Sequence, residues 1–225
     1  MTGESRRRAL LIDLFDTVVA TDFDAITSEL TAAIGCTRAD LIAQLRAVGP
    51  ALMTTTTGYE QFFVGLFRAV GRPVSDAEVG RLLDLDRELL VRHSRVHDDA
   101  RELIEHATDI GAPIALVSNC APNARALVDH FGISQWVNEV VLSCDVGIAK
   151  PDAGIFEVAC ERLGVRPDGA MFVDDQLKYC AGAAELGIDA FWVRREATGP
   201  VAEVNAGPGM VRVVKSCRDV VAFAH

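Results

Sequence analysis

Several polar side chains in this sequence directly follow short apolar runs, and a lysine precedes a helical stretch between two of them. Asp13, Ser118 and the pair Asp174 and Asp175 end such runs, and the lysine is Lys150. Carboxylates that crowd into one site raise one another's pKa values, and a divalent cation held by hard oxygen ligands resolves this conflict. These residues therefore indicate an Mg²⁺ site, with Lys150 as a further positive charge, if the fold brings them together.

The apolar runs are short and bounded by polar residues, which is typical of strands buried on both faces of a sheet. From residue 98 onward they alternate with helical patterns. The sequence thus predicts an α/β fold, with a Rossmann-like parallel sheet and helices on both faces. In such a sheet the carboxyl ends of the strands meet at one edge, where sites are built. The expected strands are residues 9–12, 113–117, 140–142, 170–173, 189–193 and 211–214.

Residues 21–97 carry a helical pattern with no intervening strand. Apolar residues recur there at helical spacing, and a capping box opens the fourth expected helix. The pair Gly49 and Pro50 is expected to end the second helix. The sequence therefore predicts two parts. Residues 1–20 and 98–225 form a core, and residues 21–97 form a four-helix insertion.

Composition narrows the class of protein. The chain has 225 residues, of which 50% are hydrophobic, and a formal net charge of −10. The acidic balance argues against nucleic acid or an anionic membrane as a partner. No apolar run approaches the roughly 20 residues that span a bilayer. The six cysteines form no Cys-x-x-Cys pair, so we expect free thiols in a reducing cytoplasm.

Four motifs in this order resemble those of the haloacid dehalogenase-like (HAD) hydrolase superfamily. They are residues 9–18 (ALLIDLFDTV), Ser118 with Asn119, residues 147–152 (GIAKPD) and residues 172–175 (FVDD). The resemblance covers nearly the whole chain. It implies the branch with a helical cap between the first and second motifs. Such a cap covers the active site and contacts the part of the substrate that does not react.

The resemblance also implies residue roles. Asp13 would attack phosphorus and form an aspartyl-phosphate, which water then hydrolyses. Lys150 would keep Asp13 ionised and neutralise charge in the transition state. The groups expected to bind phosphoryl oxygens are the hydroxyls of Thr17 and Ser118 and the main-chain amides of Leu14, Phe15 and Asn119.

The expected ligands of Mg²⁺ are the carboxylates of Asp13 and Asp175 and the main-chain carbonyl of Phe15, with Asp174 direct or through water. The favoured function is Mg²⁺-dependent hydrolysis of a small phosphomonoester. The expected partner is a small phosphorylated molecule, with no nucleic acid and no membrane, and the protein is a monomer or a homodimer.

The sequence departs from the resemblance at the position of the general acid. Related phosphatases carry a second Asp two residues after the nucleophile, which protonates the leaving oxygen and later activates water. This chain has Phe15 there, with Asp16 one residue further on. Asp16 is the candidate substitute, although neighbouring residues on a loop rarely point alike, and a hydrogen-bonding turn residue is the other interpretation.

Two alternative functions remain open. Haloacid dehalogenases also have an aromatic residue at this position, because halide leaves without a proton. They lack the acidic pair that this chain keeps in Asp174 and Asp175, and they place a Tyr where Phe156 stands. The third hypothesis is a binding or regulatory module, suggested by Phe15 and by Tyr179, which stands where relatives carry Asn or Asp.

The sequence does not identify the substrate, because the insertion carries no motif. Tyr59, Arg46, Arg68 and residues 54–57 could face the substrate there, although surface or capping roles are the favoured interpretation.

Overall fold

A computed structural model describes residues 8–196, 203–206 and 208–224. Its centre is a seven-stranded sheet, in which six strands are parallel and β8 at one edge runs antiparallel to β9. This confirms the predicted α/β class. In spatial order the strands are β5 (Glu139–Leu142), β4 (Ile114–Ser118), β1 (Ala9–Ile12), β6 (Ala170–Asp174), β7 (Asp189–Val193), β9 (Gly209–Val214) and β8 (Glu203–Ala206).

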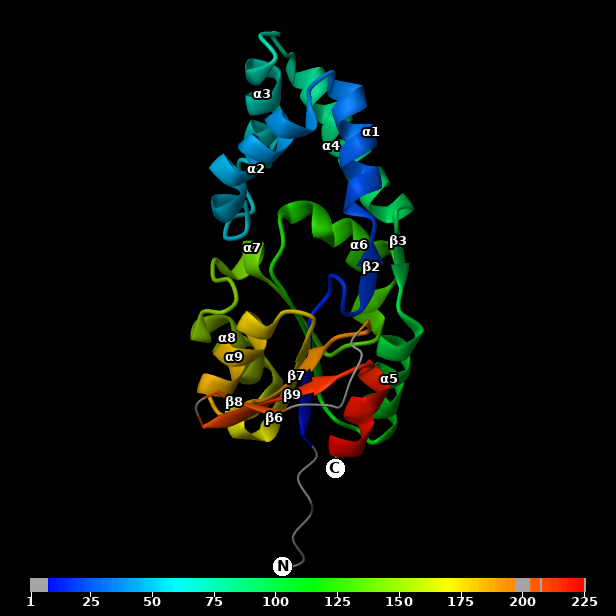
Figure 1. The fold of residues 1–225 in the computed structure, drawn as a ribbon, viewed down its shortest axis with the longest axis vertical. Coiled ribbons are helices and arrows are strands. Elements are labelled where there is room, and N and C mark those ends of the chain that lie inside the picture. The colour runs from blue at the N-terminus through cyan, green and yellow to red at the C-terminus, as the bar shows by residue number, and fades with distance from the viewer. Residues whose placement is uncertain (1–7, 197–202, 207, 225) are drawn as a thin grey trace, which may run out of the picture.

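Helices cover both faces of this sheet (Figure 1). One face carries α8 (Ala153–Leu163) and α9 (Leu177–Glu185), and the other carries α5 (Asp98–Asp109) and the 3-10 helix η4 (Cys217–Phe223). Alternate residues of each strand enter the two cores, because successive side chains of a strand point to opposite faces. The shorter elements are η1 (Pro122–Ala124), α6 (Arg125–His130), η2 (Ile133–Gln135), α7 (Ser143–Val146) and η3 (Pro167–Gly169).

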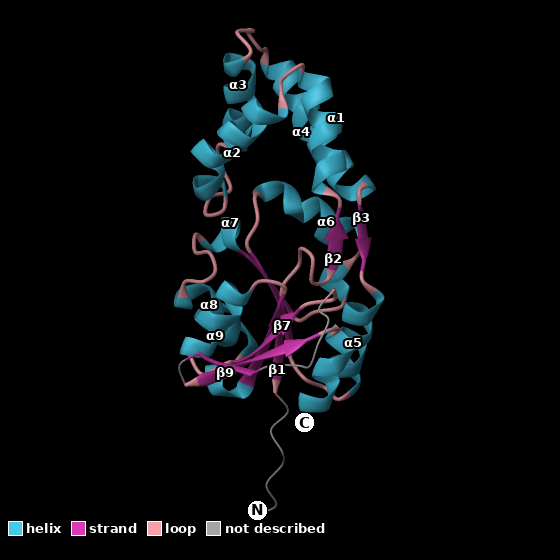
Figure 2. Ribbon diagram, viewed as in Figure 1, coloured by secondary structure: helices cyan, strands magenta, loops and turns pink. Residues whose placement is uncertain are grey.

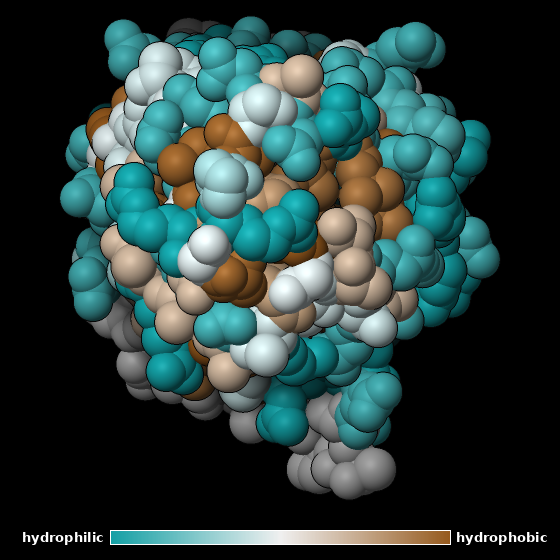
Figure 3. Space-filling model, turned by 90° about the horizontal axis from the view of Figure 1, so that it is seen from above, coloured by the Kyte–Doolittle hydropathy of each residue, from teal (hydrophilic) through white to brown (hydrophobic). Residues whose placement is uncertain are grey.

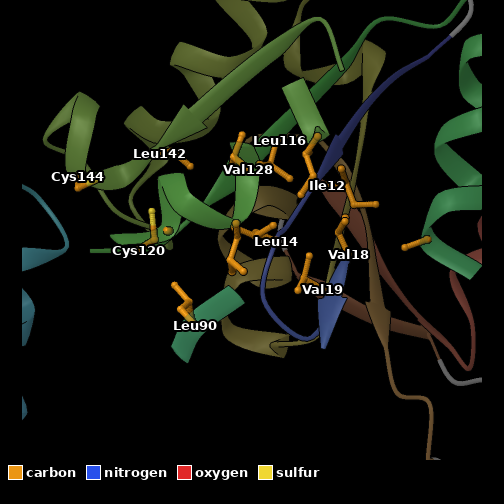
Figure 4. Packing of buried hydrophobic residues seen from close by; sticks show 14 of the residues in the cluster. Ile12, Leu14, Val18, Val19, Leu90, Leu116, Cys120, Val128, Leu142 and Cys144 are labelled. Atoms are coloured by element: carbon orange, nitrogen blue, oxygen red, sulfur yellow. The ribbon is translucent and has the colours of Figure 1, made fainter. Parts of the chain in front are cut away.

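The larger core continues from the sheet toward the insertion. Ile12, Leu116 and Leu142, from three neighbouring strands, pack with Val128 of α6, and Leu90 lies at the border of this cluster (Figure 4). All five side chains are buried. The strand ends that carry the polar residues therefore rest on a continuous apolar base.

Four helices form an insertion beyond the carboxyl edge of the sheet (Figure 2). Side-chain caps at Asp22, Thr37 and Ser75 begin three of them, each accepting a hydrogen bond from a main-chain amide of the first turn. The helices are α1 (Phe23–Ile34), α2 (Arg38–Leu52), α3 (Tyr59–Ala69) and α4 (Asp76–Arg92).

A two-stranded antiparallel ribbon joins the insertion to the sheet. It consists of β2 (Val19–Thr21) and β3 (Ser94–Val96), and Thr21 Oγ1 lies 2.8 Å from Ser94 Oγ across it. The sequence pattern did not predict this ribbon, because three residues are too few to show an alternation of polar and apolar side chains.

The predicted end of the second helix was wrong. α2 passes through Gly49 and Pro50 and ends at Leu52. Proline removes one hydrogen-bond donor from a helix, and the last turn still closes, since the Met53 amide bonds the Gly49 carbonyl at 3.1 Å.

Candidate active site

The central three strands bring the predicted polar residues together. β1 lies between β4 and β6, and Ile12 is in register with Leu116 on one side and Val173 on the other. Asp13 follows β1, and Ser118 and Asp174 are the last residues of β4 and β6. All three therefore lie at one edge of the sheet, as the parallel topology predicts.

Lys150 lies at the centre of a buried charge cluster. Its Nζ donates to Asp13 Oδ1 at 2.5 Å, to Asp174 Oδ2 at 2.7 Å and to the Val117 carbonyl at 3.0 Å. The Lys150 side chain has no exposed surface. All three ammonium protons are thus used, which is what a buried lysine requires.

The side chain of Asn119 fixes the backbone of Lys150. Its Nδ2 donates to the Lys150 carbonyl at 2.8 Å, and its Oδ1 accepts from the Lys150 amide at 2.7 Å. The sequence predicted only a main-chain role for Asn119. The amide side chain has a further role, since it holds the backbone of the lysine that contacts Asp13.

Burial and charge shift the pKa values of Lys150 and Asp13. Burial alone would lower the pKa of Lys150, but the charges of Asp13 and Asp174 outweigh it and raise this pKa to about 12. Burial raises the pKa of Asp13 to about 7, against the opposing charge of Lys150 and with a further rise from Asp174. One ammonium therefore does not balance the carboxylates at this edge.

The carboxylates fit a divalent cation. Oxygens of Asp13, Asp174 and Asp175 lie within 4.8 Å of one another. Within the described parts of the chain, Asp175 Oδ1 is buried and has no hydrogen-bond partner. Both oxygens of Asp174 already accept a hydrogen bond, Oδ1 from the Gln176 amide at 2.7 Å and Oδ2 from Lys150. An all-oxygen donor set of this kind suits Mg²⁺, and Asp13 and Asp175 are the carboxylates best placed to hold it.

Protons and Mg²⁺ should compete for these carboxylates. Burial and the charges of Asp13 and Asp16 raise the pKa of Asp175 to about 6, and that of Asp13 is about 7. Because both folded pKa values exceed the unfolded ones, these groups stabilise the metal-free protein at low pH. That stability is lost as pH rises from about 4 to about 7. We expect Mg²⁺ to raise Tm clearly at about pH 8 and little at about pH 5.

Thermal unfolding with and without Mg²⁺ measures this difference. Asp175→Asn should reduce the shift at the higher pH, and Asp84→Asn, at an exposed carboxylate of α4, should not. Equal shifts at both pH values would contradict the expectation.

The two predicted hydroxyls occupy different settings. Thr17 is buried, and its Oγ1 accepts from the Asp175 amide at 3.1 Å, so it holds the loop that carries this carboxylate. Ser118 Oγ is also buried, and no hydrogen-bond partner for it occurs among the residues that the structure describes. The Ser118 hydroxyl thus has no partner among the described residues, whereas the Thr17 oxygen accepts one hydrogen bond and its own proton stays available to donate.

The loop after Asp13 is tightly held. Asp16 has a φ of 57°, a left-handed conformation that aspartate tolerates better than most residues. Arg195 donates to the carbonyls of Asp16 and Thr17 at 2.7 and 2.9 Å. The sequence did not predict this role of Arg195, because every residue type has the main-chain carbonyl that accepts such a hydrogen bond. The Asp16 side chain is exposed and lines a cavity.

That cavity, about 440 Å³ in volume, lies between the sheet edge and the insertion. Asp13, Phe15 and Tyr179 line its base, and the Phe15 ring packs on Phe23 of α1 with centroids 5.6 Å apart. Leu14 is fully buried below it. The roles of the Leu14, Phe15 and Asn119 amides and of the Phe15 carbonyl stay predictions.

Of the side chains named as possible substrate contacts, Tyr59 lines the cavity, whereas Arg46, Arg68 and residues 54–57 are not among the described residues that do. Sequence reasoning missed Asp86 and Asn123, which also line it. A signal existed for Asp86, because it lies in phase with Val79, Leu82 and Leu89 on the buried face of α4.

A Rossmann-like sheet that carries a buried aspartate, a buried lysine and paired carboxylates at its carboxyl edge is the arrangement that the four sequence motifs predicted, and it indicates a hydrolase. The chain belongs to the haloacid dehalogenase-like hydrolases, whose family model matches residues 7–187. This confirms the resemblance seen in the sequence.

Relatives with different activities match part of the chain. Glyceraldehyde 3-phosphate phosphatase of Methanopyrus kandleri is 37% identical over 36% of this chain and 35% of its own. Phosphoserine phosphatase of Thermus thermophilus is 30% identical over 60% and 53%. (S)-2-haloacid dehalogenase 4A of Burkholderia cepacia is 31% identical over 53% and 50%. The chain thus matches about a third to a half of the length of these relatives.

Solved structures share the fold. A HAD family enzyme from Bacteroides thetaiotaomicron has a TM-score of 0.70 at 20% identity, over 85% of this chain and 95% of its own. A second structure of that enzyme, in complex with magnesium and inorganic phosphate, has a TM-score of 0.69 at 21% identity, over 85% and 96%. A dehalogenase has a TM-score of 0.64 at 21% identity over the whole of both chains. Likeness at this level of identity shows the fold alone.

No helix in the described ranges is long and apolar enough to cross a membrane.

Proposed function

We propose that this hydrolase is an Mg²⁺-dependent phosphatase that acts on a small phosphomonoester, with Asp13 as the nucleophile. The observation that carries the proposal is the paired carboxylates of Asp174 and Asp175 beside Asp13, with a buried Asp175 oxygen that has no partner among the described residues. A buried carboxylate oxygen without a donor is costly, and a cation would satisfy it. The two phosphatase relatives support the same activity.

The chain's own residues supply most of the proposed chemistry. Asp13 attacks phosphorus while the P–O bond to the alcohol breaks and the alcohol leaves with a proton, and water then hydrolyses the aspartyl-phosphate to phosphate. The contact with Lys150 lowers the pKa of Asp13 against the effect of burial and so favours the ionised form that attacks. Ser118 donates its free hydroxyl to a phosphoryl oxygen. Thr17 positions Asp175 through the main-chain amide. Mg²⁺, held by Asp13 and Asp175, would neutralise phosphoryl charge.

The proposal extends to the organisation of the chain. Residues 21–97 would act as a cap that contacts the leaving group, over a catalytic core of residues 1–20 and 98–225. A cytoplasmic location fits the six cysteines, which are all free thiols. The substrate is a small molecule.

Dehalogenation is the second candidate, because Phe15 occupies the position of the missing acid and lines the cavity. It would use Asp13 as the nucleophile on carbon and would need no proton donor for the halide. The paired carboxylates have no task in that reaction, which is why we place it second.

Parallel assays separate the two activities. Phosphate release from a panel of phosphomonoesters and halide release from 2-haloacids should be measured with and without Mg²⁺. We expect phosphate release that requires Mg²⁺. Halide release without phosphate release would establish the second candidate. If neither product formed although Mg²⁺ bound, a binding or regulatory module would be the better interpretation.

Asp16 is the proposed general acid. The fall in kcat when Asp16 is replaced should therefore depend on the leaving group. Asp16→Asn keeps the left-handed backbone, which asparagine also tolerates. We expect kcat to fall by about 10²–10⁴-fold for alkyl phosphates, whose alkoxide needs a proton, and far less for nitrophenyl phosphate. Steady-state kinetics on both substrates test this, with Asp129→Asn as an exposed control. Equal losses on both substrates would rule out an acid role.

A further inference from the structure

The walls of the cavity are apolar above the sheet edge. Leu30, Leu52 and Phe62 contribute from three different helices of the insertion. Seen from the insertion, apolar side chains lie near the middle of the molecular face, with hydrophilic ones among and around them (Figure 3). The part of a bound molecule that lies in this cavity would exchange water for hydrocarbon contacts, which favours an apolar group.

The charged groups of the cavity share one sign. Asp13, Asp16 and Asp86 line it, and no Lys, Arg or His does so within residues 8–196, 203–206 and 208–224. Lys150 lies behind Asp13, with its three protons already used. An anionic group placed in the upper cavity would therefore lose its water without gaining a cationic partner.

Asp86 is a buried carboxylate in the upper cavity, the part of the cavity that the helices of the insertion line. Its side chain projects from α4 and is 5% exposed. Tyr59 Oη of α3 and Asn123 Nδ2 of η1 both donate to the same oxygen, Oδ2, at 2.7 and 2.8 Å. For the other oxygen, Oδ1, the described residues supply neither a hydrogen-bond donor nor an ion pair. A buried carboxylate with one unused oxygen can accept one more donor from a bound molecule.

We infer that Asp86 selects the substrate, and that the substrate is a phosphomonoester of an apolar alcohol that ends in a hydrogen-bond donor. The inference rests on the proposed phosphatase activity, which places the phosphate at Asp13. The donor is an ammonium or a hydroxyl group that reaches Asp86 Oδ1. A leaving group that carries a carboxylate is rejected, because it would meet Asp86 with like charge, and no cation among the described residues lines the cavity to pair with it.

Four matched alkyl phosphates test the inference, with about four to eight carbons to suit a cavity of this size. At the far end they carry a methyl, hydroxyl, ammonium or carboxylate group. Binding to the Asp13→Asn variant is measured by calorimetry with Mg²⁺ present, and turnover is measured with the wild-type enzyme. We expect the hydroxyl or ammonium ester to be preferred over the carboxylate ester by about 10- to 100-fold.

The variants separate recognition from structure. Asp86→Asn should lower this preference ratio by at least about tenfold, because the amide can donate to a carboxylate and no longer attracts a cation. Asp84→Asn is the matched control, since it makes the same change at an exposed position of the same helix. It should leave the ratio unchanged. Tyr59→Phe, which keeps the Asp86 carboxylate, should retain the preference.

Each outcome has one meaning. Equal binding of the carboxylate ester, absent binding of every ester, or a ratio that survives Asp86→Asn would overturn the inference, since Asp86 would then only link insertion and core. The expected binding preference without phosphate release would support recognition by Asp86 while refuting the phosphatase proposal. Phosphate release without any preference would do the reverse.

Discussion

Replacing Asp13 by asparagine is expected to abolish turnover without unfolding the protein. Loss of a catalytic nucleophile typically lowers kcat by on the order of 10⁴–10⁶-fold. The amide has nearly the same shape, and Lys150 keeps its 2.7 Å contact with Asp174. Burial and Asp174 both raise the pKa of Asp13, so removing this charge also removes a repulsion. We therefore expect a Tm equal to or above that of the wild type.

Phosphate release and thermal unfolding, measured on the same preparation, test both halves of this expectation. Residual activity within about tenfold of the wild type would show that Asp13 is not the nucleophile. A variant that is inactive because it fails to fold would show instead that the Asp13 charge is needed for structure. Asp129→Asn, at an exposed position, controls for the substitution itself.

Replacing Lys150 by methionine should remove activity and also destabilise the fold. Asp13 and Asp174 would both lose their buried cation, and breaking a buried pair costs about 3–5 kcal/mol. For a domain of this size we expect Tm to fall by about 10 °C. The exposed Lys215→Met variant is the control.

The destabilisation by Lys150→Met should depend on pH in a defined direction. Without the ammonium, burial raises the folded pKa values of both carboxylates further, so their protonated forms are favoured. A raised carboxyl pKa stabilises the folded state at low pH, and this contribution is lost as pH rises. The Tm deficit of the metal-free variant should thus be smaller at about pH 5 than at about pH 8. A deficit that is the same at both pH values would contradict this account.

The sequence predicted the sheet and the residues at its edge for one physical reason. Strands buried on both faces need continuous apolar runs, and parallel strands bring their carboxyl ends together. Asp13, Ser118 and Asp174 were therefore found without knowledge of any contact. The hydrogen bonds between the Asn119 side chain and the Lys150 backbone were not predicted, because the two residues lie 31 positions apart in the sequence.

Other features could not be predicted because they depend on packing between elements. Asp86 interrupts an apolar helix face, but only the neighbouring positions of Tyr59 and Asn123 show what it does there. The left-handed conformation of Asp16 depends on the bend of the loop, to which Arg195 contributes from a distant segment. Pro50 lies so near a helix end that its missing donor costs little.

The ribbon of β2 and β3 has a kinetic consequence for an enzyme that must admit a substrate and release a product. Two separate linkers would each sample many conformations, and closing over a ligand would carry their entropy cost. Here the two linkers are hydrogen-bonded to each other, so they bend as one stiff element. A motion of the helices relative to the sheet would therefore bend both strands together and follow one coordinate, with most of the ordering cost already met when the chain folds.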